Sequence, residues 1–109
     1  MITGKVLGRQ YIINRRTADV AGFTPDMSAD IYYEVVRLMD RKFLFLDDHL
    51  ERLQHSLAGS GLQYPGKDSI IDCLRLLQLN NDETIGNIRI CIQDKTGHDA
   101  DLLCYYVPY

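Results

Sequence analysis

The hydrophobic period changes within residues 31–57, and this change restricts the folds open to the chain. Residues 31–38 (IYYEVVRL) are rich in β-branched and aromatic side chains, which predicts a strand whose side chains alternate between two faces. One face carries Tyr33, Val35 and Arg37, and the other carries Tyr32, Glu34, Val36 and Leu38. Residues 39–41 predict a turn and residues 42–46 an antiparallel return strand, so the segment begins as a hairpin.

A helical period follows at once. The buried stripe that it predicts consists of Leu46, Leu50, Leu53 and Leu57. Asp47 and Asp48 lie at the start of this helix, where we expect their side-chain oxygens to cap free N–H groups. Gly59 and Gly61 are typical of residues that end a helix.

The remaining elements repeat the two types of period. A second helix is predicted from about Asp68, and its apolar face is formed by Ile70, Ile71, Leu74 and Leu77, with Cys73 as a further candidate. Asn80, Asn81 and Asp82 close it. Strands are predicted at residues 87–93 and 102–107, with a polar turn at 94–101, and residues 10–14 could form another short strand. The order predicts an α+β fold, in which an antiparallel sheet is packed on one side by two helices.

The size and composition of the chain limit its organisation and its partners. A length of 109 residues suits one domain, so we expect residues 1–109 to form a single unit. The formal net charge of −3 argues against nucleic acid as a partner. There is no long apolar run and no signal-peptide pattern at the start, so we expect no membrane association and a cytoplasmic location.

The three cysteines, Cys73, Cys91 and Cys104, lie far apart inside apolar stretches. This placement favours buried core residues over a disulfide framework or a zinc site, because no Cys-x-x-Cys spacing supplies paired ligands. The histidines at positions 49, 55 and 98 form no metal-binding pattern either.

The first helix carries the most informative polar residues. His49, Arg52 and Ser56 fall at positions i, i+3 and i+7, so they share a stripe away from the leucines. A guanidinium presents a planar fork of donors that matches two phosphate oxygens. The alternative is an ordinary solvated helix in which Arg52 pairs with Asp48 at i−4.

The run Tyr-Glu-Val-Val-Arg at residues 33–37, followed by Phe-Leu-Phe-Leu-Asp-Asp-His-Leu-Glu-Arg-Leu at 43–53, resembles the start of class IV aminotransferases. These fold-type-IV enzymes use pyridoxal 5′-phosphate (PLP). The resemblance implies that Arg52 binds the cofactor phosphate and that Tyr33 and Val35 line the substrate pocket. It also implies that Arg89 contacts a substrate carboxylate, as in some members.

Each pocket residue has an alternative interpretation. Tyr33 and Val35 could be core residues, because an aromatic residue and a valine on one strand face are usually buried. Arg89 could be a strand-face arginine that points to solvent. The sequence also departs from the family pattern, since residues 27–30 and 93–95 replace a glycine-rich turn and a Thr-Arg-Gly run of many members. The substrate is therefore left open, with branched-chain and D-amino acids both admissible.

The resemblance also places the catalytic groups outside this chain. Transamination needs a lysine that bonds covalently to PLP and an acidic group at the pyridine nitrogen. In the resembling enzymes both come from a second domain, and none of the lysines here, Lys5, Lys42, Lys67 and Lys95, matches the catalytic position. We therefore expect the N-terminal domain of a longer homodimeric enzyme, with no catalytic residue of its own.

Three functions agree with these residues. The first is an aminotransferase domain that acts on an α-amino acid and a 2-oxo acid. The second is a β-elimination enzyme of the aminodeoxychorismate lyase branch, which would use the same fold and cofactor. The third is a non-catalytic binding or assembly module, which gains weight if the gene ends at Tyr109.

Overall fold

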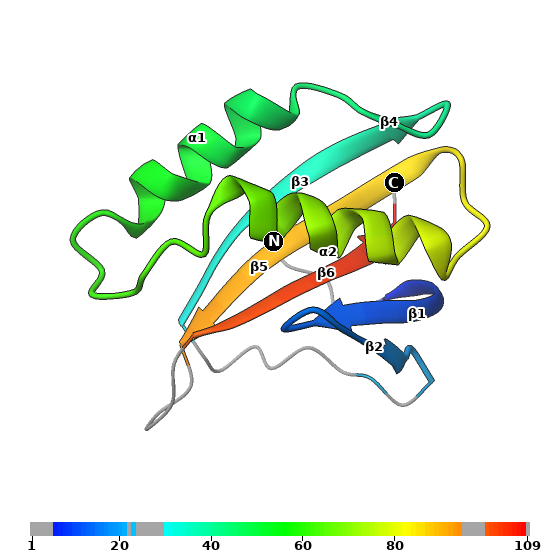
Figure 1. Ribbon diagram of the computed structural model, residues 1–109, viewed down its shortest axis with the longest axis horizontal. Helices are drawn as coiled ribbons and strands as arrows, with labels where there is room; N and C mark the ends of the chain where they lie inside the picture. The colour runs from blue at the N-terminus through cyan, green and yellow to red at the C-terminus, as the bar shows by residue number, and fades with distance from the viewer. Residues whose placement is uncertain (1–5, 22, 24–29, 95–99, 109) are drawn as a thin grey trace.

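The structure, a computed structural model, describes residues 6–21, 23, 30–94 and 100–108. It contains one six-stranded sheet with the strand order β2-β1-β6-β5-β3-β4, in which all neighbouring strands are antiparallel. Both helices cover the same face of this sheet (Figure 1). The elements are β1 (Leu7–Ile13), β2 (Arg16–Asp19), β3 (Asp30–Met39), β4 (Lys42–Phe43), α1 (Leu46–Leu57), α2 (Lys67–Leu79), β5 (Gly86–Asp94) and β6 (Asp101–Val107). The α+β fold class predicted from the sequence is confirmed.

The hairpin of β3 and β4 forms as predicted, but its second strand is shorter than expected. Asp40 and Arg41 both have positive φ angles, 49° and 65°, which is the backbone of a tight two-residue turn. β4 pairs with β3 only at two positions, so the expected strand over 42–46 is wrong beyond residue 43. The chain turns away because Phe45 has a left-handed backbone, with φ 54° and ψ 35°, immediately before α1.

α1 buries the predicted leucine stripe. Leu50, Leu53 and Leu57 are buried, and Leu46 packs at the edge of the core. The capping prediction is wrong, because Phe45 occupies the N-cap position and no side chain caps the helix. Asp47 and Asp48 lie in the first helical turn instead, where their negative charges favour the positive end of the helix dipole.

The main core lies between the helices and the sheet. α2 contributes Ile70, Cys73, Leu74 and Leu77, and three central strands contribute a dense set of side chains. That set comprises Val36, Leu38, Ile88, Ile90, Ile92, Leu102, Cys104 and Tyr106. The opposite sheet face carries a smaller buried cluster of Cys91, Leu103, Tyr105 and Val107. The strands predicted at 87–93 and 102–107 are confirmed within β5 and β6, whereas residues 95–99 of the predicted turn lie outside the described residues.

The N-terminal hairpin goes beyond the predicted short strand at 10–14, because β1 begins earlier and β2 pairs with it. Asn81, which follows α2, holds this hairpin against the helix layer. Its Oδ1 accepts hydrogen bonds from the backbone N–H groups of Arg9 (2.8 Å) and Gln10 (3.2 Å). Its Nδ2 donates to the carbonyl oxygens of Gln10 (3.1 Å) and Leu77 (2.8 Å). The side-chain amide of Asn81 therefore forms hydrogen bonds with the backbone of β1 in the way that a neighbouring strand would.

No helix in the described part of the chain is long and apolar enough to cross a membrane.

Candidate functional site

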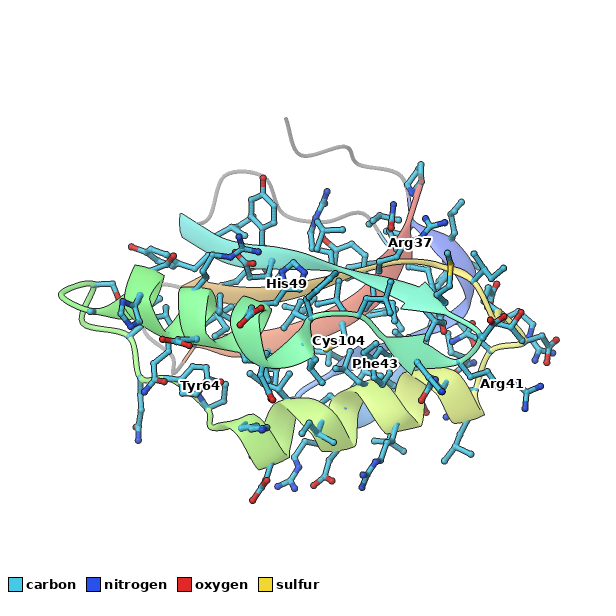
Figure 2. The ribbon with its side chains drawn as sticks, turned by 90° about the horizontal axis from the view of Figure 1, so that it is seen from above. Arg37, Arg41, Phe43, His49, Tyr64 and Cys104 are labelled. Carbon is cyan, nitrogen blue, oxygen red and sulfur yellow. The ribbon has the colours of Figure 1, made fainter. Side chains whose placement is uncertain are left out.

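A cluster of three polar side chains joins β3 to α1. Glu34 is on the helix-covered face of β3, and its Oε1 lies 2.7 Å from Nδ1 of His49. The same oxygen accepts from Nε of Arg52 at 3.1 Å and lies 3.0 Å from its Nη2. Nη2 also lies 2.9 Å from Nδ1 of His49. Figure 2 shows His49 in the space between α1 and β3.

The members of this cluster differ in exposure. The side chains of Glu34 and His49 are 17% and 16% exposed, whereas that of Arg52 is 65% exposed. Glu34 therefore anchors one edge of the guanidinium, the Nε and Nη2 edge, while Arg52 remains at the surface. Among the described residues, Nη1 of Arg52 makes no hydrogen bond. The alternative pairing of Arg52 with Asp48 is wrong, because Arg52 pairs across to β3.

Arg52 lies at the side of a shallow surface groove of about 630 Å³. The residues that line it are Glu34, Asp48, Glu51, Arg52, His55 and Ser56. The predicted stripe therefore borders a groove at Arg52 and Ser56, and the Ser56 hydroxyl donates to the carbonyl oxygen of Arg52 at 3.0 Å. A phosphate would fit at the end where Arg52 has a free donor, and the acidic residues would disfavour it elsewhere in the groove.

A second cluster occupies the opposite sheet face. The Cζ atom of Arg89 lies 5.2 Å from the ring centroid of Tyr33 and 5.8 Å from that of Tyr105. Nη1 of Arg89 donates to the Tyr105 hydroxyl at 3.4 Å. Arg89 is only 5% exposed, so the interpretation that it points to solvent is wrong. Val35 packs against the small apolar cluster on this face, whereas Tyr33 is 37% exposed above Arg89.

Tyr105 was not singled out by sequence reasoning. It lies directly opposite Arg89 in the β5–β6 register, and its hydroxyl is also 3.5 Å from Sγ of Cys91. Burial raises the pKa of Tyr105 well above its usual value, and burial likewise raises the pKa of Cys91 to about 11. The sequence offered one signal that could have identified Tyr105. An arginine buried in an apolar strand needs a polar neighbour, and an adjacent strand can supply it.

The two clusters do not touch, because they lie on opposite faces of the sheet. They share β3, in which Glu34 points to the helix layer and its neighbours Tyr33 and Val35 point to the other side. In the described part of the chain, β4 covers the outer edge of β3 only at Leu38 and Met39. A ligand that lay across the uncovered edge near residues 33–35 could reach side chains of both faces.

The described lysines lack the features of a nucleophile. Lys67 pairs with Asp47 at 2.7 Å, and this hydrogen bond, together with the charge of Asp47, raises the pKa of the ammonium. A nucleophilic amine requires the opposite shift. Lys42 is exposed in β4, and Lys5 and Lys95 lie outside the described residues.

The three cysteines that were predicted to be core residues are all buried, and none of them forms a disulfide. Cys73, Cys91 and Cys104 are all buried and free, which confirms the prediction from their apolar sequence contexts. No group of three or more histidine, cysteine or acidic side chains suited to a metal ion occurs among the residues that the structure describes.

Comparison with solved structures shows a shared fold. The branched-chain amino acid aminotransferase from Escherichia coli superposes with a TM-score of 0.77 at 15% sequence identity, over 94% of this chain and 42% of that chain. The enzyme from Thermoproteus uzoniensis, solved with norvaline, gives 0.66 at 17% identity, over 94% and 41%. The PLP form of the enzyme from Thermobaculum terrenum gives 0.65 at 18% identity, over 95% and 41%.

At these identities the likeness shows the fold, and the chain spans less than half the length of each of these aminotransferases. The sequence matches no family model, and it matches no curated protein. The structural comparison therefore places the chain in the architecture of one part of a branched-chain aminotransferase.

Proposed function

We propose that this chain is the small domain of a PLP-dependent class IV aminotransferase, which transfers an amino group between an α-amino acid and a 2-oxo acid. Two independent observations support this function. The chain has the fold of the corresponding part of branched-chain aminotransferases. It also carries an anchored but exposed arginine at the position that the sequence resemblance assigns to phosphate binding.

The arrangement of Glu34 and Arg52 carries the proposal. An isolated surface arginine is flexible, and ordering its side chain on binding costs free energy. Here one carboxylate oxygen holds Nε and Nη2, so the guanidinium plane is oriented before a ligand arrives. Nη1 remains available at the rim of the groove. In this role Arg52 binds the phosphate, and Glu34 and His49 position Arg52.

The other face of β3 would supply one wall of the substrate pocket. Tyr33 and Val35 would limit the size of the substrate side chain, and Arg89 would attract a carboxylate. PLP itself supplies the electron sink that the reaction needs. We propose that the covalently bonded lysine and the acidic partner of the ring nitrogen belong to a further domain, and that the complete enzyme is a homodimer. On this proposal the present chain alone does not catalyse the reaction.

Phosphate recognition can be tested on the chain itself. The suitable probe is pyridoxine 5′-phosphate, because it lacks the aldehyde of PLP and cannot react with surface lysines such as Lys42. Titration followed by ¹H–¹⁵N NMR should move the amide signals around Arg52, and pyridoxine without phosphate should not move them. Arg52→Ala should weaken binding about 10- to 150-fold, which corresponds to the loss of a charge-assisted hydrogen bond worth about 1.5–3 kcal/mol.

The matched control is Arg75→Ala, which removes an exposed arginine from α2 and should leave the affinity unchanged. Arg52→Lys should recover only part of the affinity, because an ammonium cannot be held by Glu34 and still present a fork of donors. Equal affinity of the wild type and Arg52→Ala for the phosphorylated probe would refute the assignment of Arg52.

The proposed domain organisation needs a separate test. The messenger RNA beyond the codon for Tyr109 should continue in frame into a second domain that contains a lysine. A stop codon directly after Tyr109 would instead support a non-catalytic binding or assembly module with the same fold.

A further inference from the structure

The imidazole of His49 lies between the carboxylate of Glu34 and the guanidinium of Arg52. Its Nδ1 atom is 2.7 Å from Oε1 of Glu34 and 2.9 Å from Nη2 of Arg52. Two lone pairs would repel each other at 2.7 Å, so the short contact assigns a proton to Nδ1, which donates it to Glu34. The hydrogens of Nη2 then point to Oε1, 3.0 Å away, because a protonated ring nitrogen cannot accept them.

The second ring nitrogen, Nε2, is the atom of His49 that can gain a proton. It has no hydrogen-bond partner among the described residues and is not a buried atom, so it is open to solvent. Imidazole is the side-chain group whose charge changes most readily near neutral pH. A proton on Nε2 would convert the ring into an imidazolium cation, and the Nδ1–H bond to Glu34 would remain in place.

The charges around Arg52 favour such a proton when an anion binds. The groove beside Arg52 is lined by the carboxylates of Glu34, Asp48 and Glu51 and by the one guanidinium, so its net charge is −2 while its histidine is neutral. A dianion bound to Arg52 makes this region more negative still. Nearby negative charge favours the charged form of an imidazole, and Nδ1 of His49 is only 2.9 Å from the Arg52 donor. A dianion on Arg52 therefore favours the imidazolium form of His49.

We propose that His49 takes up a proton at Nε2 when a dianion such as phosphate binds Arg52, so that two cations hold the ligand and the site releases it as the pH rises. This inference rests on the proposed role of Arg52 in phosphate binding. By linkage, a ligand that favours the protonated ring binds more tightly where the ring is already protonated. The affinity for a dianion should therefore rise as the pH falls and the imidazole gains its proton.

The charged groups that face His49 come from two elements, β3 and α1. β3 presents Glu34 and α1 presents Arg52, and no other charged side chain in the described part of the chain forms a hydrogen bond or ion pair with the ring. His55 is the alternative proton acceptor, because it lines the same groove in the last turn of α1. His55 is exposed, so water and salt screen its charge from a ligand at Arg52. His49 is 16% exposed and touches the guanidinium directly, which favours it as the acceptor.

Sulfate is the probe that isolates this proton, because it remains a dianion from about pH 6 to pH 8, whereas a phosphate monoester titrates in that range itself. Sulfate is added to the folded, ¹⁵N-labelled chain at constant ionic strength, and the amide signals around Arg52 are followed by NMR. We expect binding to be at least about fivefold tighter at pH 6 than at pH 8. His49→Gln should lose this pH dependence, because glutamine keeps an N–H donor for Glu34 but cannot gain a proton.

Long-range ¹H–¹⁵N correlation spectra of the imidazole rings provide a direct readout of the proton. In the free chain at pH 8, Nδ1 of His49 should have the chemical shift of a protonated nitrogen and Nε2 that of an unprotonated one. Sulfate added at pH 7 should move the Nε2 signal toward the protonated value, and Arg52→Ala should abolish this movement. A merely structural role of His49 would leave Nε2 unchanged, and that result would overturn the proposal.

The outcomes separate this inference from the proposed function. Sulfate that binds at Arg52 with equal affinity at pH 6 and pH 8 would overturn the inference and leave the phosphate role of Arg52 intact. A pH dependence that is lost in His55→Gln and retained in His49→Gln would also overturn it, because His55 would then take up the proton. Absence of sulfate binding at both pH values would overturn it as well, and the titration with pyridoxine 5′-phosphate would then decide separately whether Arg52 binds phosphate.

Discussion

Two adjacent buried tyrosines are predicted to respond in opposite ways to the loss of a hydroxyl group. Tyr105 and Tyr106 are each 2% exposed, but they face opposite sides of the sheet. The Tyr105 hydroxyl accepts from Arg89 and contacts Cys91, whereas the Tyr106 hydroxyl has no hydrogen-bond partner among the described residues. Tyr106→Phe should therefore stabilise the chain, and Tyr105→Phe should destabilise it.

The expected magnitudes follow from the burial of each group. A buried hydroxyl without a partner costs about 1–3 kcal/mol, and its removal also loses some packing, so Tyr106→Phe should raise the free energy of unfolding by about 1 kcal/mol. Tyr105→Phe removes a hydrogen bond to a charged guanidinium. Because that bond is long, at 3.4 Å, we expect a loss at the lower end of the usual range, about 1–2 kcal/mol.

The alkaline limb of the stability curve provides a second test of Tyr106. Burial, and then the nearby negative charge of Glu83, raise the pKa of Tyr106 to about 12 from an ordinary value near 10. The folded state therefore holds this proton more tightly than the unfolded state. The contribution to stability that is present below pH 10 should fall by about 1.4 kcal/mol per pH unit above it, to a total loss of about 2.3 kcal/mol at pH 12. Tyr106→Phe should remove this part of the slope.

Urea unfolding followed by circular dichroism, at pH 7 and then between pH 9 and pH 12, measures both effects. Tyr105→Phe serves as the control at pH 7, since it removes the same oxygen from an equally buried ring. A loss of 1 kcal/mol or more in Tyr106→Phe at pH 7 would refute the reasoning. It would show that the hydroxyl has a partner, for example a buried water that also binds the unpaired Oε2 of Glu83.

Four further changes can be measured in the same assay. Arg41→Gly should stabilise the chain by about 0.5 kcal/mol, because glycine tolerates the φ of 65°, and unchanged or lower stability would contradict this. Leu53→Ala, at a fully buried site in α1, should cost about 2–5 kcal/mol, and a cost below 1 kcal/mol would show that α1 is loosely packed. Asn81→Ala should cost about 2–4 kcal/mol through its four backbone contacts, and amide exchange in β1 should rise with it. Glu34→Gln should lower the free energy of unfolding by about 1–2 kcal/mol, mainly through loss of the buried contact to His49. An unchanged stability would show that the contacts of Glu34 with His49 and Arg52 do not stabilise the fold.

Local periodicity accounts for the parts of the fold that could be predicted from the sequence. The alternation of residues 31–38 and the leucine stripe of α1 each depend on side-chain direction within one element, and both predictions are confirmed. The length of β4 could not be predicted in this way. It depends on Phe45, whose left-handed backbone lets α1 return over the sheet, and an aromatic residue rarely adopts that conformation.

The features of the fold and the site that the sequence did not predict depend on contacts between residues far apart in the chain. Asn81 supports β1 across 71 and 72 residues of chain, so no local pattern could assign it that role. Arg89 and Tyr105 meet because of the β5–β6 register, which a sequence alone does not specify. The sequence placed His49 and Arg52 on one stripe but did not identify Glu34 as their common partner. A usable signal existed, because Glu34 is the one charged residue on the predicted face of Tyr32, Glu34, Val36 and Leu38, and a buried charge needs a partner.

The register of β3 is what allows one short segment to serve both proposed parts of the site. Successive residues of a strand point to opposite faces, so Glu34 reaches α1 only if Tyr33 and Val35 face away from it. A slip of one residue would turn Glu34 toward Arg89 and leave His49 and Arg52 without their carboxylate. The nine-position pairing of β3 with β5, from Asp30 to Leu38, opposes such a slip. The orientation of the proposed phosphate-binding arginine and the shape of the proposed pocket wall are therefore fixed by the same backbone hydrogen bonds, and a variant that shifts this register should lose both together.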